Sequence, residues 1–78
     1  MMVDLKLAKQ LVKALDMAIK KEREAQERYL REATYAYEFD VKKLFKELLH
    51  EEIGHERMLT AKKLAVLKDI ARLEKNKK

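Results

Sequence analysis

The chain of 78 residues contains no cysteine, no proline and no tryptophan, and it has a single glycine. The absence of cysteine excludes disulfide bonds, thiolate zinc sites and iron–sulfur clusters. A chain below about 80 residues usually needs such a bond, a metal or a partner chain to hold a stable fold. A metal held by oxygen and nitrogen ligands, or association with another chain, therefore remains as the source of stability.

The sequence also lacks long apolar runs. Near the C-terminus the longest covers only residues 64–67, which is far too short to span a bilayer as a helix. At the N-terminus Asp4, Lys6 and Lys9 interrupt the apolar residues, so no signal-peptide core is recognisable there. These observations predict a cytoplasmic protein without a membrane-spanning helix.

What the chain does contain is charge and helix-forming residues: 42% of it is charged and 47% hydrophobic. Such a mixture is typical of long helices. Apolar residues recur every three or four positions in both halves, which indicates two amphipathic stretches. The recurring positions are Ala8, Leu11, Leu15, Ala18, Ala25, Tyr29, Ala33 and Ala36 in the first half, and Val41, Phe45, Leu48, Leu59, Val66, Ile70 and Leu73 in the second.

The segment at residues 34–41 decides between one helix and two. It gathers β-branched and aromatic residues of modest helix propensity. Asp40 is a suitable N-cap, and Phe39 and Leu44 have the spacing of a hydrophobic staple around it. We therefore predict one helix at about residues 4–37, a turn at 38–40 and a second helix at about 41–74. A single long coiled-coil helix is the alternative.

The predicted fold is all-α: a long antiparallel helical hairpin that forms one domain over residues 1–78. A second row of apolar residues broadens the stripe of the second helix, as expected for a helix that contacts two or three others. Two helices cannot cover both stripes by themselves. We therefore expect a homodimer, or a higher homo-oligomer, in which two hairpins form a four-helix bundle.

Three polar residues interrupt the apolar stripes. Glu22 lies between Ala18 and Ala25, and Glu52 and His55 lie within the second stripe. With a turn near residue 39, the numbers of facing residues add to about 78, so Glu22 lies within one helical turn of the other two. Glu52 and His55 share a face at i and i+3 and can address one ion.

A cluster of buried carboxylates is costly without a partner. In a two-fold dimer the cluster holds four carboxylates and two imidazoles, and two divalent cations would neutralise it. Each residue taken alone has a simpler explanation: a glutamate in such a helix is commonly at the surface, and His55 could be a core histidine bonded to Glu51 or Glu52. The coincidence of all three at one height favours a metal site.

The same residues resemble the rubrerythrin branch of the ferritin-like superfamily. Glu22 followed by Ala25 and Tyr29 is similar to its first-helix motif, and Glu52 with His55 is similar to its E-x-x-H helix. The resemblance covers roughly residues 18–59. It implies a ferritin-like bundle with Glu22 and Glu52 as carboxylate ligands, Glu52 bridging two ions, His55 as the terminal nitrogen ligand and Tyr29 as a phenol near the carboxylates.

Two departures from that family affect the implied function. Rubrerythrins carry four helices in one chain, whereas this chain supplies two, as the encapsulated ferritins do. No tail that would target an encapsulin shell is evident after Leu73, so the sequence gives no support for that partner. Rubrerythrins also feed electrons through a cysteine-ligated domain, so a peroxide-reducing cycle here requires an external electron donor.

The resemblance implies two iron ions per dimer, with manganese or zinc as other candidates, and an activity like that of a ferroxidase or a rubrerythrin-type peroxidase. His50 lies off the stripe, and we expect it to face solvent. Two alternatives remain open. One is a metal-free structural or interaction hairpin. The other is a basic hairpin that binds nucleic acid through its net charge of +5, although no recognised motif accompanies that charge.

Overall fold

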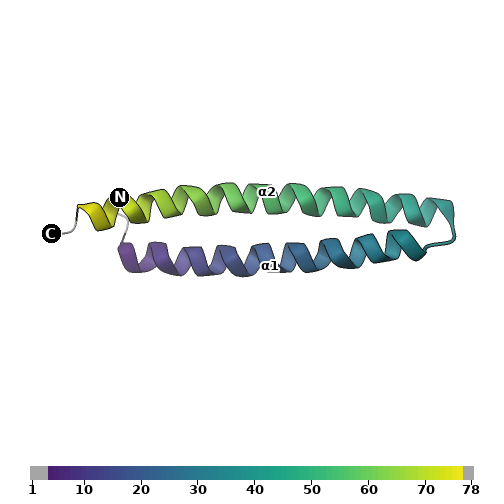
Figure 1. Ribbon diagram of the computed structural model, residues 1–78, viewed down its shortest axis with the longest axis horizontal. Coiled ribbons are helices and arrows are strands. Elements are labelled where there is room, and N and C mark those ends of the chain that lie inside the picture. The colour runs from purple at the N-terminus through teal and green to yellow at the C-terminus, as the bar shows by residue number, and fades with distance from the viewer. Residues whose placement is uncertain (1–3, 77–78) are drawn as a thin grey trace.

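The computed structural model describes residues 4–76 and contains two long helices that run side by side in opposite directions (Figure 1). Helix α1 spans Leu5–Tyr35 and helix α2 spans Phe39–Lys75. The start of α1 and the end of α2 lie at one end of the hairpin, the open end, and the turn lies at the other. The predicted all-α hairpin is confirmed, and the alternative of one continuous helix is wrong.

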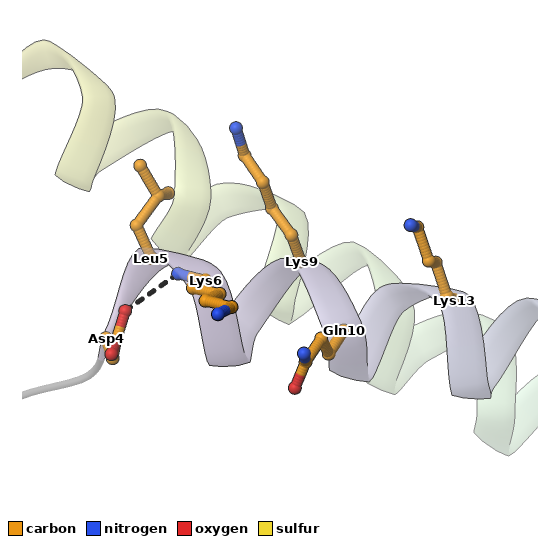
Figure 2. Close-up of a pocket in the computed structure, with 6 residues that line it drawn as sticks. All are labelled: Asp4, Leu5, Lys6, Lys9, Gln10 and Lys13. Atoms are coloured by element: carbon orange, nitrogen blue, oxygen red, sulfur yellow. Dashed lines mark hydrogen bonds between the residues drawn. The ribbon is translucent and has the colours of Figure 1, made fainter.

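Side-chain and backbone caps explain where α1 begins and ends. Asp4 precedes the helix, and its carboxylate accepts a hydrogen bond of 2.8 Å from the backbone N–H of Lys6 (Figure 2). This contact satisfies one of the amide donors that a first helical turn leaves free. At the other end Ala36 turns to an extended conformation, while its N–H still donates to the carbonyl of Glu32. The helix therefore ends two residues before the predicted position 37.

The start of α2 corrects the prediction that Asp40 is the N-cap. Glu38 caps this helix, and its carboxylate accepts from the backbone N–H groups of Asp40 and Val41 at 3.1 and 2.9 Å. The longer glutamate side chain reaches both amides, so Asp40 becomes part of the first turn. There its negative charge is favourable beside the positive end of the helix dipole.

The predicted hydrophobic staple is also wrong. Phe39 is the first residue of α2 and does not precede the cap, so it lacks the position that a staple requires. Both Phe39 and Leu44 are largely exposed, at 74% and 51%. The connection between the helices is therefore residues 36–38, and it is held by the Glu38 cap.

The interface between the two helices is narrow. Only Ala8, Ile19 and Ala33 are buried among the hydrophobic residues that the structure describes, and all three belong to α1. The hairpin exposes 6635 Å², whereas a compact protein of its mass would expose about 5,000 Å². A pair of helices leaves this excess because each helix can cover only one side of the other. The structure contains one hairpin and does not test the predicted dimer.

Charged residues recur along the whole length of both helices. Within residues 4–76, no helix is long and apolar enough to cross a lipid bilayer. The charges also make cross-helix contacts, which fix how the two helices are aligned along their length and are described with the site below.

The single glycine, Gly54, lies in the middle of α2, where a Cβ atom would meet nothing within 4 Å. Alanine favours a helix interior over glycine by about 1 kcal/mol. We therefore expect Gly54→Ala to raise the free energy of unfolding by about that amount, as measured by urea denaturation. A loss of stability would instead show that another backbone packs against Gly54 in the assembled protein.

Candidate metal centre

The structure brings Glu22, Glu52 and His55 together across the two helices. Each offers one ligand atom, and these atoms all lie within 4.8 Å of one another. The Nδ1 atom of His55 is 3.6 Å from Oε2 of Glu22 and 3.6 Å from Oε2 of Glu52. The convergence predicted from the sequence is therefore present within a single hairpin.

The three side chains differ in their exposure. Those of Glu22 and Glu52 are 23% and 18% exposed, whereas that of His55 is 52% exposed. The carboxylates thus lie in the seam between the helices, and the imidazole lies at the edge of that seam. His55 remains accessible to a molecule that approaches this edge of the hairpin.

One carboxylate oxygen of the cluster has no hydrogen-bond partner. Oε2 of Glu22 is buried, and no donor in the described part of the chain satisfies it. The imidazole at 3.6 Å is too far away for a hydrogen bond. Buried acceptors in proteins normally accept a hydrogen bond or bind an ion. Within the described residues, this acceptor of Glu22 is therefore left unsatisfied.

The ligand atoms of the cluster, all within 4.8 Å of one another, are spaced somewhat more widely than around a bound metal ion. Ligand atoms at about 2.1 Å from a shared ion lie roughly 3.0–3.4 Å apart in octahedral or tetrahedral geometry. The two contacts of 3.6 Å exceed this range only slightly. A donor set of two carboxylates and one imidazole suits divalent iron, manganese or zinc.

One chain supplies three ligand atoms. An ion that takes four to six ligands would keep at least one further position for water or for another side chain. The carboxylates of a second copy, approaching the edge where His55 is exposed, could supply the remaining ligands. A single hairpin does not test the shared site expected from the sequence.

A second polar group lies on the opposite edge of the hairpin and was not predicted. Glu56 accepts a hydrogen bond of 2.8 Å from Nε2 of Gln26, and it pairs with Arg23 at 3.3 Å. Arg23 and Glu56 directly follow Glu22 and His55 in the sequence, and one residue along a helix corresponds to a rotation of about 100°. This group therefore fixes the alignment of the two helices at the height of the cluster without using its ligands.

Two more ion pairs cross the same edge as Arg23 and Glu56. Lys9 pairs with Glu74 at 3.2 Å, and Lys63 pairs with Asp16. In α1 these residues recur every seven positions, at 9, 16 and 23, so they lie along one face. For the pairs at Asp16 and Arg23, the two residue numbers again add to about 78, as they do for the residues of the cluster. The same sum, applied to charged residues, would have predicted these two ion pairs from the sequence.

The remaining predicted residues have simpler surroundings. The ring of Tyr29 lies 6.1 Å from that of Phe45, and the guanidinium of Arg28 lies 5.5 Å from the Tyr29 ring centre. No hydrogen bond in the described residues joins the Tyr29 hydroxyl to the cluster, so its predicted role near the carboxylates stays a prediction. His50 is exposed, as expected.

The structure thus shows that Glu22, Glu52 and His55 lie close together. Comparison of the chain with protein-family models, with curated proteins and with solved structures finds no match. The resemblance to the rubrerythrins therefore rests on the arrangement of Glu22, Tyr29, Glu52 and His55 in the sequence.

Proposed function

We propose that this protein binds metal through Glu22, Glu52 and His55 of two copies, forming a ferritin-like di-iron centre. The observation that carries the proposal is the buried Oε2 atom of Glu22, which lacks a hydrogen-bond partner and lies within 4.8 Å of ligand atoms from the other two residues. A carboxylate-rich site of this kind holds two divalent cations with little net charge. Manganese and zinc fit the same donor set, and the proposal favours iron because of the rubrerythrin-like pattern.

The proposed reaction is oxidation of Fe(II), which is the substrate. Two Fe(II) ions supply the two electrons that reduce one dioxygen, together with two protons, to hydrogen peroxide. They can equally reduce one hydrogen peroxide, with two protons, to two waters. The carboxylates hold the more highly charged Fe(III) product better than Fe(II), because hard oxygen ligands favour the higher charge. A repeated peroxide-reducing cycle would draw electrons from an external donor in the cytoplasm.

Iron oxidation provides the functional test. Anaerobic protein is loaded with Fe(II) and then mixed with dioxygen or peroxide, while the appearance of Fe(III) is followed by its absorbance. We expect the wild type to oxidise Fe(II) faster than a protein-free solution, and Glu52→Ala to fall to the protein-free rate. The matched control is His50→Ala, which removes an exposed imidazole from the same helix and should leave the rate unchanged.

A metal-free structural hairpin is the second candidate, and one observation favours it. Nδ1 of His55 lies equally far from both carboxylates, so the three side chains also suit a purely structural contact between the helices. In that case His55 would stabilise the hairpin directly, and adding Fe(II) or Mn(II) would leave the unfolding temperature of the wild type unchanged. A clear rise in that temperature with metal would exclude this candidate.

A further inference from the structure

A third glutamate, Glu56, lies in the seam between the helices beside the candidate metal ligands. It follows Glu52 by four residues, so the two side chains are neighbours on one face of α2. Its number and that of Glu22 add to 78, which places these two residues at one height in the hairpin. The side chain of Glu56 is 25% exposed, close to the 23% of Glu22. Three carboxylates of similar burial therefore lie within about one helical turn of one another.

Glu56 differs from the other two carboxylates because both of its oxygens are engaged by α1. Oε1 accepts a hydrogen bond of 2.8 Å from Nε2 of Gln26, and Oε2 lies 3.3 Å from Nε of Arg23. Oε2 of Glu22 has no such partner among the described residues. The group of possible ligand atoms within 4.8 Å of one another does not include Glu56. Its carboxylate is thus held away from the cluster, on the opposite edge of the hairpin.

The ion pair also keeps the charge of Glu56 separate from that of the cluster. Arg23 offsets the negative charge of Glu56, so each chain contributes two further carboxylates, Glu22 and Glu52, whose two negative charges match one divalent cation. Without the guanidinium, Glu56 would be a partly buried carboxylate with no charged partner, which is costly. A metal ion bound at the cluster would then offer the missing positive charge.

We propose that Arg23 and Gln26 are positioning residues that keep Glu56 from coordinating the metal and so leave one position of the ion open to the oxidant. This inference rests on the proposed metal site and adds two residues that set its number of carboxylate ligands. Neither residue contacts the ion. An open position of this kind distinguishes catalytic metal sites from closed structural ones.

The affinity of the full-length protein for Mn(II) tests the proposal without any turnover, because electron paramagnetic resonance measures the free ion directly. In Arg23→Gln the carboxylate of Glu56 loses its charged partner and is free to join the ion. We expect the dissociation constant to fall by about tenfold, since residues that adjoin a metal site commonly change its affinity by 10- to 100-fold. Gln26→Leu should lower the constant less, because the charge of Arg23 remains.

The oxidation of Fe(II) should respond in the opposite direction to the affinity. In Arg23→Gln, Glu56 takes the position that the oxidant needs, so Fe(III) should appear more slowly than in the wild type although the metal is held more tightly. A residue that only aligned the helices would not produce this combination, because misaligned ligands would weaken binding and slow oxidation together.

Matched variants separate the charge of Arg23 from its packing. Arg23→Lys keeps the positive charge and should retain the wild-type dissociation constant. Glu56→Gln alone should also leave it unchanged, since Glu56 is not a ligand in the wild type. Combining Glu56→Gln with Arg23→Gln should restore the wild-type constant, because the side chain set free is then a neutral amide. The Arg23 side chain is 64% exposed, so these variants should fold, and circular dichroism checks their helical content.

The possible results separate this inference from the proposed function. Tighter Mn(II) binding by Arg23→Gln, reversed by adding Glu56→Gln, supports the inference. Weaker or unchanged binding by Arg23→Gln overturns it, as does tighter binding that Glu56→Gln does not reverse, and the metal site of the wild type still stands in both cases. Weaker binding by Glu56→Gln alone also overturns it, because Glu56 would then already be a ligand. Failure of the wild type and of every variant to bind Mn(II) overturns the proposed function together with the inference.

Discussion

Glu22→Leu should abolish metal binding and at the same time make the metal-free protein more resistant to heat. The buried Oε2 of Glu22 lacks a hydrogen-bond partner, and such a group costs about 1–3 kcal/mol. Because the side chain is 23% exposed, we expect a gain near the lower end. A gain of about 1 kcal/mol would raise the unfolding temperature of a chain this size by roughly 4–8 °C.

The stabilisation by metal should differ between the two proteins. Fe(II) or Mn(II) should stabilise the wild type, by about 4 kcal/mol at a thousandfold excess over the dissociation constant, since only the folded state assembles the ligands. Glu22→Leu should gain little. Thermal unfolding followed by circular dichroism gives the unfolding temperature of each protein with and without metal. Marked destabilisation of metal-free Glu22→Leu would show that Glu22 stabilises the fold, which contradicts its assignment as a buried metal ligand.

The folded protein should not exist as a monomer at micromolar concentration. Only three hydrophobic residues of the described chain are buried, and none of them belongs to α2. Such a small core does not offset the conformational entropy lost when about 70 residues become ordered. Light scattering should therefore give a mass at least twice the 9.3 kDa of one chain.

Dilution provides the stronger form of this test. If folding depends on association, helical content measured by circular dichroism should fall as the protein is diluted below the dissociation constant of the dimer. Metal should shift this loss to lower concentration, because ions bound at the proposed shared site would link the two copies. A mass of one chain with helical content that does not change on dilution would show that the hairpin is stable alone and that its exposed apolar residues are tolerated.

The fold was largely predictable because hydrophobic periodicity is a strong signal over two helices of 31 and 37 residues. The turn was harder. Asp40 and Glu38 are both acidic residues before an apolar stretch, and only the backbone geometry decides which side chain reaches the free amides. The sequence therefore located the connection to within two or three residues but assigned the wrong cap.

The row of residues that faces the other helix was predicted only in part. Ala8 and Ala33 are buried as the spacing indicated, but Ile19 is buried where Ala18 had been placed in the stripe. Counting three or four residues from Leu15 reaches both positions, and the sequence does not decide between them. Leu11, predicted within the stripe, is 48% exposed in the single hairpin.

The candidate site was predictable because Glu22, Glu52 and His55 interrupt apolar stripes at matching heights. The relative exposure of these three side chains was not predictable. A stripe pattern does not show which residues lie in the seam of one hairpin and which lie at its edge. The contacts of Glu56 with Gln26 and Arg23 were missed since each of these residues, taken alone, is ordinary on a helix surface.

The metal content of the purified protein after loading with Fe(II) and removal of unbound ions tests the central claim most directly. The account predicts about one iron per chain, a content reduced to background in His55→Ala and in Glu52→Ala, and a full complement in His50→Ala. Iron retained in full by His55→Ala, or its absence from the wild type, would contradict the assignment of Glu22, Glu52 and His55 as a metal site.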